Sequence, residues 1–325
     1  MRFRVDGVLR NAVTLPKNSH SAIISRIKIM AEMDIAEKRL PQDGRINIEQ
    51  GGRDIDLRIS TLPTILGEKV VMRILDKTAA SIDINDLAFT AKNMELYSSL
   101  FNSSYGIVLV TGPTGSGKST TLYSTLTNIN NPNKNIITVE DPVEYRIEGV
   151  NQVAVNNKAG LTFANGLRSI LRQDPNIIMV GEIRDVETAR ISIHAALTGH
   201  LVFSTLHTND AAGAITRLID MGVEPFLVAS ALRGVVAQRW CAVSVRIAKK
   251  PMLLTRQKGL YGIALDEEVK LYKGAGCGKC NFTGYVGRMA IHEVLPIIPE
   301  MKELILKMLP IRKFLLPDVL MALLL

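Results

Sequence analysis

Short, uninterrupted apolar runs alternate with segments of helical periodicity through the middle of the chain. The runs G-I-V-L-V, N-I-I-T-V, N-I-I-M-V and H-L-V-F-S-T-L end at residues 110, 139, 180 and 206, and such runs are typical of strands that are covered on both faces. Amphipathic segments lie between them, for example V-E-T-A-R-I-S-I-H-A-A-L over residues 186–197. This alternation predicts an α/β fold with a mostly parallel sheet, which binds ligands at the carboxyl ends of its strands.

The first 77 residues have a different pattern. Alternating apolar and polar positions over residues 3–9, 54–60 and 69–75 predict strands, and residues 21–31 have the spacing of a helix. The chain is therefore expected to divide into a small α+β domain (1–77), a polar linker with a leading helix (78–104), the α/β core (105–239) and a C-terminal subdomain (240–325).

Composition narrows the class of protein. The chain has 325 residues, of which 47% are hydrophobic and 22% charged. This length and composition are typical of a globular protein that can bury sizeable cores. Three cysteines, an odd number, argue against a secreted disulfide framework and for a reducing cytosol. No signal peptide is visible, because Met1 is followed by R-F-R-V-D-G and not by an apolar run. No run is expected to span a membrane, because the apolar tail is short and broken by Pro317 and Asp318. The net charge of +8 is spread along the chain and gives little support for a nucleic-acid partner.

The strongest motif is a glycine-rich loop, G-P-T-G-S-G-K-S-T, between the first apolar run and a helical segment. Its glycines let backbone N–H groups point at phosphate oxygens, Lys118 supplies a positive charge, and the Ser119 hydroxyl can bind Mg²⁺. The motif predicts a site for ATP with Mg²⁺. The residues expected to bind the nucleotide are Gly112, Pro113, Thr114, Gly115, Ser116, Gly117, Lys118, Ser119 and Thr120.

Acidic residues follow two of the other predicted strands. Glu182 comes directly after the run that ends at residue 180, where a carboxylate can reach the Mg²⁺ shell. Another strand ends with Glu140, Asp141 and Glu144, of which Glu144 is placed to act as general base over the nucleotide. The alternative interpretation is a solvated acidic strand end. His207 ends a fourth strand, where sensing of the γ-phosphate, a hydrogen bond to Glu182 and a purely structural role all remain open.

These elements, in this order, resemble the ATPases of type II secretion and type IV pilus assembly. The resemblance is carried by I-T-V-E-D-P-V-E (137–144), V-G-E-I-R-D (180–185), T-G-H-L-V-F-S-T-L-H-T-N (198–209) and two stretches of the first domain, D-I-A-E-K-R-L-P-Q-D-G-R and L-R-I-S-T-L-P-T-I-L-G-E-K-V-V-M-R-I-L. It covers about residues 1–239 and 270–300, and it implies a RecA-like P-loop ATPase core behind a PAS-like second N-terminal domain.

The resemblance also implies roles and partners. Glu144 would be the catalytic base, Glu182 the acid at the metal and His207 the histidine-box residue, while Arg58 and Arg73 of the small domain would complete the nucleotide pocket. The family implies a homohexamer in the cytoplasm, held at the inner face of the bacterial inner membrane through a platform protein and associated secretion or pilus components. A nucleic-acid partner is not expected.

The C-terminal subdomain departs from the family pattern. Family members carry two CxxC pairs that bind zinc, but here only Cys277 and Cys280 form a pair, and Cys241 stands alone. The segment from residue 240 reads W-C-A-V-S-V-R-I-A-K-K, and every codon permits L-V-R-R-L-C-P-H-C-Q-K in a shifted frame. We therefore hypothesise a frame slip that removed the first pair and left the zinc site unoccupied. A genuine zinc-free variant is the competing interpretation.

Both ends of the chain also differ from the expected pattern. Met1 falls within an early strand of the first domain, which suggests an N-terminal truncation, and the tail after Lys307 loses its amphipathic pattern. The favoured function is an extension-type motor subunit that hydrolyses ATP for pilus or pseudopilus assembly. An inactive fragment that binds nucleotide and a DNA-translocating P-loop ATPase are the alternatives.

Overall fold

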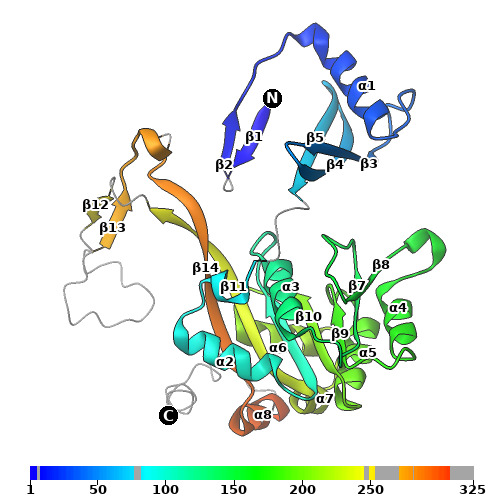
Figure 1. Cartoon of the computed structure of the whole chain (residues 1–325), viewed down its shortest axis with the longest axis vertical. Coiled ribbons are helices and arrows are strands. Elements are labelled where there is room, and N and C mark those ends of the chain that lie inside the picture. Colours follow the sequence, from blue (N-terminus) through cyan, green and yellow to red (C-terminus); the bar gives the residue numbers. More distant parts are fainter. Residues whose placement is uncertain (6–7, 77–81, 245–248, 253–270, 281, 308–325) are drawn as a thin grey trace.

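The structure is a computed structural model that describes residues 1–5, 8–76, 82–244, 249–252, 271–280 and 282–307. Figure 1 shows a small N-terminal part, in shades of blue, and a larger core that follows it in the chain. No described helix has the length and apolar character needed to cross a membrane.

The core is built on a seven-stranded sheet with the order β14-β11-β6-β10-β9-β7-β8. Every neighbouring pair is parallel except β11 and β14, which run antiparallel. The expected apolar runs form its centre, since β6 and β10 are buried along their whole length. The strands are β6 (Gly106–Thr111), β7 (Ile136–Glu140), β8 (Asn151–Ala154), β9 (Ile177–Val180), β10 (Leu201–Leu206), β11 (Leu232–Ser244) and β14 (Tyr285–Pro296).

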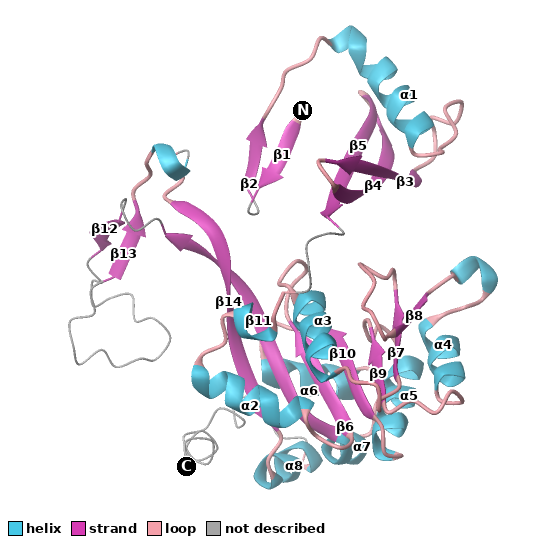
Figure 2. Cartoon of the chain, in the orientation of Figure 1, coloured by secondary structure: helices cyan, strands magenta, loops and turns pink. Residues whose placement is uncertain are grey.

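Helices cover both faces of this sheet, as Figure 2 shows. On β6, Val108 and Val110 pack toward α2 (Ala91–Phe101) and α3 (Lys118–Ile129), while Ile107 and Leu109 pack into the opposite cluster. That second cluster contains α4 (Phe163–Ile170), α5 (Val186–Leu197), α6 (Ala211–Asp220), α7 (Pro225–Ala231) and α8 (Pro299–Leu306). The prediction of an α/β, RecA-like core with a mostly parallel sheet is confirmed.

Side-chain caps explain where three of these helices begin. Thr162, Asp185 and Asp210 each accept a hydrogen bond from the backbone N–H three residues later, at the starts of α4, α5 and α6. Such caps satisfy N–H groups that have no partner within the helix. Short 3₁₀ turns occur at Lys17–Ser19, Ile84–Leu87, Asn157–Ala159 and Gly278–Cys280.

The N-terminal part has the expected α+β composition. An antiparallel sheet of β3 (Gln42–Gln50), β4 (Arg53–Thr64) and β5 (Gly67–Asp76) packs with α1 (His20–Met30). Its small core includes Ala31, Met33, Ile46 and Ile59. The likeness to a PAS domain stays a prediction.

The first predicted strand, residues 3–9, is in fact two strands. β1 (Arg2–Val5) and β2 (Val8–Asn11) form an antiparallel pair in which Val5 lies opposite Val8. The alternation of apolar and polar residues continues through both strands, so it conceals the break. The intervening Asp6-Gly7 pair is the sequence signal of a two-residue hairpin, and it identifies the break.

The strands β11 and β14 form a long ribbon that extends beyond the rest of the core sheet (Figure 1). A separate pair, β12 (Lys249–Met252) and β13 (Leu271–Gly274), lies near its far end. Because β14 belongs to the core sheet, that sheet draws on residues from both sides of the boundary expected after residue 239.

Candidate functional site

The glycine-rich loop connects β6 to α3 at the carboxyl edge of the parallel sheet. Gly112 has φ +148°, and a methyl group on its Cα would lie 2.3 Å from the carbonyl oxygen of Gln238 on β11. Gly117 caps α3 with φ +87°, and a methyl group there would lie 2.9 Å from Cζ2 of Trp240. Both positions therefore require glycine, because β11 packs directly against the loop.

The loop is lined by polar groups that suit a bound phosphate. The Lys118 Nζ donates to the carbonyl oxygens of Gly112 and Pro113 at 3.0 and 3.1 Å, and so bends back over its own loop. Burial lowers the pKa of Lys118, while the nearby Glu182 carboxylate raises it. The buried Ser116 Oγ has no hydrogen-bond partner among the described residues, and Ser119 is exposed beside it. A phosphate chain would supply partners for these groups.

Glu182 lies in the turn after β9, among cationic groups. Its Oε1 pairs with Arg184 Nη2 at 2.5 Å, and its Oε2 lies 3.8 Å from His207 Nε2. Burial lowers the pKa of His207, the Lys118 charge lowers it further, and Glu182 opposes both. The contact of His207 with Glu182 is thus one of the possibilities that the sequence left open.

The segment that carries His207 is tied to the start of the glycine-rich loop. Thr111, the last residue of β6, accepts a hydrogen bond from the Thr208 N–H at 2.9 Å, and the two hydroxyl groups lie 2.7 Å apart. The Thr111 hydroxyl also donates to the Leu206 carbonyl at 3.1 Å. These hydrogen bonds join the end of β6, where the loop begins, to the end of β10.

Glu144 faces the small domain. Arg58 on β4 approaches the Glu144 carboxylate with an Nη2–Oε2 distance of 3.5 Å and donates to the Val143 carbonyl at 3.4 Å. Arg73 lies opposite Arg58 in the β4–β5 pairing and is exposed. Of the two arginines that the family resemblance named, Arg58 contacts the segment that carries Glu144, whereas Arg73 has no ion pair with a described residue of this site.

Glu140, named in the sequence among three acids, is buried at 4% exposure. Burial raises the pKa of its carboxyl group, and hydrogen bonds from Thr138, Tyr123 and Gln152 oppose that shift. Sequence reasoning missed Tyr123, because a tyrosine within an amphipathic helix carries no signal beyond ordinary packing. Only the fold shows that Tyr123, five residues after Lys118 on α3, reaches Glu140.

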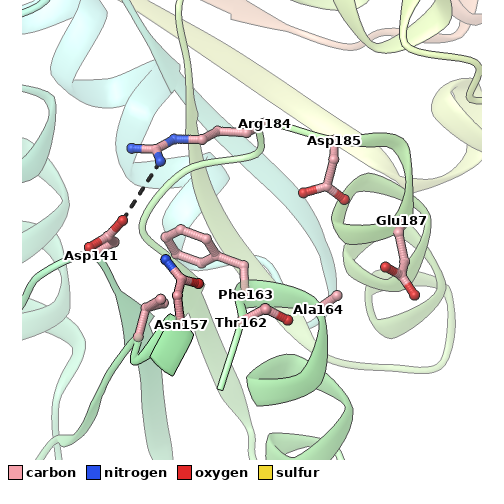
Figure 3. Close-up of a pocket in the computed structure, with 9 residues that line it drawn as sticks. Asp141, Asn157, Thr162, Phe163, Ala164, Arg184, Asp185 and Glu187 are labelled. Carbon is pink, nitrogen blue, oxygen red and sulfur yellow. Dashed lines mark ion pairs between the residues drawn. The ribbon is translucent and has the colours of Figure 1, made fainter. Parts of the chain in front are cut away.

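Asp141 and Arg184 form an ion pair in the lining of a pocket of about 290 Å³ (Figure 3). Their closest charged atoms are 3.7 Å apart, and Arg184 also pairs with Glu182. The hydrogen bond to Glu182 raises the pKa of Arg184. Phe163 and Glu187 are among the other lining residues. Arg184 thus links the acids at the ends of β7 and β9.

The expected cysteine pair is present in the knuckle between β13 and β14. The Sγ atoms of Cys277 and Cys280 lie 3.7 Å apart. Burial raises the pKa of Cys280, but hydrogen bonds that include the N–H groups of Cys277 and Gly284 outweigh it and lower the pKa to about 7.

The described part of the chain contains one CxxC pair, Cys277 and Cys280. No cluster of three or more potential metal ligands occurs among the described residues. Residues 245–248 and 253–270 lie outside the description, so the frame-slip hypothesis and zinc occupancy stay predictions. The described start of the unusual segment, through Ser244, continues β11. The changes expected in the tail after residue 307 also fall outside the described residues.

Taken together, the groups at this edge suit phosphate chemistry. Backbone N–H groups, Lys118 and Ser119 could hold phosphates and Mg²⁺, Glu182 could order the metal, and Glu144 could accept a proton. These residues follow the ends of two strands, β7 and β9, and the loop after β6, at the carboxyl edge of the α/β core.

Comparison with known sequences gives a consistent result. The family model "Type II/IV secretion system protein" matches residues 1–312. The chain is 53% identical over 306 residues to the type II secretion system ATPase E of Vibrio cholerae. The matched residues cover 94% of this chain and 61% of that protein. It is 54% identical over 312 residues to the type IV pilus assembly ATPase PilB of Thermus thermophilus, which covers 94% of this chain and 35% of that one.

Solved structures agree on the fold. The pilus retraction motor PilT with bound ADP superposes with a TM-score of 0.62 at 28% identity, covering 94% of this chain and 79% of PilT. The ATPase DotB of Legionella pneumophila gives 0.64 at 20% identity, over 92% of this chain and 74% of DotB, a likeness of fold alone. The chain thus spans about three fifths of the length of its type II relative.

Proposed function

The chain belongs to the type II/IV secretion system protein family, and from that premise we propose that it is an ATP-hydrolysing motor subunit for assembly of a type II pseudopilus or a type IV pilus. The observation that carries the proposal is the grouping of Lys118, Glu182 and His207 at the glycine-rich loop. A positive charge, a metal-ordering acid and a histidine at one phosphate site are the parts that phosphoryl transfer needs.

Each residue has a defined task in this proposal. The loop from Gly112 to Thr120 binds the phosphates, and Lys118 leaves its contacts with Gly112 and Pro113 to reach the nucleotide. Mg²⁺, held through Ser119 and Glu182, would neutralise charge on the phosphates. His207 senses whether the nucleotide site is occupied, through its contact with Glu182.

Glu144 is the proposed general base, and Arg58 its partner from the small domain. The Glu144 Oε2 lies 3.5 Å from Nη2 of Arg58, and this guanidinium could neutralise phosphate charge during hydrolysis. Arg73, on the adjacent strand, would join once the small domain closes further over the nucleotide. Because the two arginines and the base lie on different domains, hydrolysis could be coupled to domain motion.

The assembly and location follow from the family by proposal. Subunits would form a homohexamer in the cytoplasm, associated with the inner membrane through a platform protein and other machinery components. The small domain exposes Ile65 and Leu66 almost completely at the β4–β5 turn, and such apolar exposure favours an interface with another chain.

The test is ATP hydrolysis by the purified chain and its Lys118→Ala variant, with native mass measured in parallel. We expect Mg²⁺-dependent hydrolysis that Lys118→Ala reduces at least about 100-fold, because the phosphates lose their principal cation. Nucleotide binding without turnover in the wild type would favour the inactive-fragment alternative. Hydrolysis stimulated by DNA would favour the translocase, and unchanged turnover in Lys118→Ala would remove the phosphate-loop assignment.

A further inference from the structure

Tyr123 lies where the helix of the phosphate loop meets the segment that carries Glu144. It is 1% exposed on α3, and its ring meets the ring of Tyr145 edge-on, with centroids 4.6 Å apart. The Tyr123 hydroxyl accepts a hydrogen bond from the Glu144 backbone N–H at 3.1 Å. The ring of Tyr123 thus packs against Tyr145, and the Tyr123 hydroxyl binds the main chain of Glu144.

The same hydroxyl donates to the buried carboxyl group of Glu140. A tyrosine oxygen can donate one hydrogen bond and accept another, and donation to a carboxylate makes that oxygen a stronger acceptor. The chain of hydrogen bonds therefore runs from Glu140, through Tyr123, to the main chain of Glu144. The Glu140 carboxyl group, where this chain of hydrogen bonds begins, is itself held in place because the Thr138 hydroxyl donates to it at 2.5 Å.

Gln152 on β8 fastens the segment from the other side. Its Nε2 donates to Glu140 at 3.2 Å and to the Tyr145 carbonyl at 3.1 Å, and its Oε1 accepts from the Ile147 N–H at 2.8 Å. The main chain on either side of residue 145 is thereby tied to one buried carboxyl group. The Glu144 side chain, in contrast, is 37% exposed and reaches outward toward Arg58.

We propose that Tyr123, held by Glu140, is a positioning residue that sets the place of the Glu144 carboxylate relative to the phosphate loop. Tyr123 does not touch the reacting atoms. It fixes the main chain of the residue that does, and because it stands on α3 it moves with the loop that binds the phosphates. This proposal rests on the proposed role of Glu144 as general base.

A purely structural role for the cluster makes a different prediction. If Tyr123 only filled the core, loss of its hydroxyl would lower stability and leave the turnover of folded protein unchanged. A positioning role predicts a fall in kcat with nucleotide affinity unaltered, since the phosphate loop keeps its own contacts.

The test is a double-mutant cycle on ATP hydrolysis by the full chain. Tyr123→Phe keeps the ring against Tyr145 and removes only the hydroxyl, and we expect kcat to fall about 10-fold with ADP affinity unchanged. Tyr97→Phe is the matched control. It removes another buried hydroxyl group bonded to α3, 2.5 Å from Thr125, and should leave kcat at the wild-type value.

The cycle identifies the residue through which Tyr123 acts. In a Glu144→Gln background, Tyr123→Phe should cause no further loss, because the base that it positions is gone. An equal loss in both backgrounds, or wild-type kcat in Tyr123→Phe, overturns the positioning role while the proposed function stands. Wild-type turnover in Glu144→Gln itself overturns the general-base assignment and the positioning role with it.

A second variant tests the same hydrogen-bond network independently, in case Tyr123→Phe does not fold. Gln152→Leu changes a half-buried position on the edge strand β8 and removes the amide that ties Glu140 to Tyr145. The same pattern, lower kcat with unchanged ADP affinity, is expected. Wild-type kcat in this variant would count against the Glu140 anchor.

Discussion

At the scale of single residues, the candidate site is a set of opposed charges in which each group depends on its neighbours. Glu182 is near enough to Lys118 and His207 to raise the pKa of both, while burial lowers both. Burial and the Lys118 charge favour the neutral imidazole of His207, and its Nε2 lies 3.8 Å from the Glu182 carboxylate, too far for a direct hydrogen bond.

A second histidine lies outside this site and makes a separate test possible. His292 on β14 is 8% exposed and stacks on Phe89 with ring centroids 3.6 Å apart. Neither ring nitrogen has a hydrogen-bond partner among the described residues. Burial therefore lowers the pKa of His292 from 6.5 to about 4.

This shift predicts a pH dependence of stability. Between pH 6.5 and 4 the unfolded chain takes up a proton at this residue that the folded chain does not, so the free energy of unfolding falls as the pH drops. We expect His292→Phe to remove roughly 2 kcal/mol of that loss while keeping the stack on Phe89. Urea unfolding at pH 7 and pH 4.5 would measure it. Equal pH dependence in the two proteins would contradict the assigned burial of a neutral imidazole.

At the scale of elements, the sequence predicted more of the fold than of the site. The apolar runs identified the buried strands because burial on both faces leaves no position for polar residues. Edge strands gave weaker signals: β8 mixes polar residues and was missed, as was β3, where only Ile46 and Ile48 alternate. The contacts of Arg58 with Glu144 and of Tyr123 with Glu140 bring together residues distant in sequence, which no local pattern encodes.

The glycine-rich loop makes an element-scale prediction. Gly112→Ala places a methyl group 2.3 Å from the Gln238 carbonyl oxygen, so loop and β11 must separate. We expect ADP affinity to fall at least about 10-fold. Gly160→Ala is the comparison, because Gly160 lies outside the loop, its methyl group would meet nothing within 4 Å and only the φ of +74° opposes it. A loss of ADP affinity in Gly160→Ala as large as that in Gly112→Ala, by calorimetric titration, would contradict the packing account.

At the scale of the whole molecule, the site depends on contact between the small domain and the core. Arg58 reaches across to Val143 and Glu144 from a strand of the small domain. In the proposed function the core alone would bind the phosphate groups, whereas the environment of the proposed base also depends on the contact with the small domain.

This dependence can be measured with one pair of arginine variants. Arg58→Ala should lower kcat about 10-fold or more, because it removes the cation beside Glu144. Arg45→Ala removes the same charge from the neighbouring strand, at an exposed position opposite Arg58 in the β3–β4 pairing, and should retain wild-type turnover. Equal kcat values for the two variants would show that the interdomain contact has no part in hydrolysis.

The most direct test of the central claim is the fate of ATP at this site. Wild-type protein and Glu182→Gln would each be mixed with Mg²⁺ and ATP, and the protein-bound nucleotide identified over time. The account predicts ADP and phosphate from the wild type, and retained, unhydrolysed ATP in the variant, because the loop still binds phosphates while the metal-ordering acid is lost. ADP formed at equal rates by both proteins would contradict it.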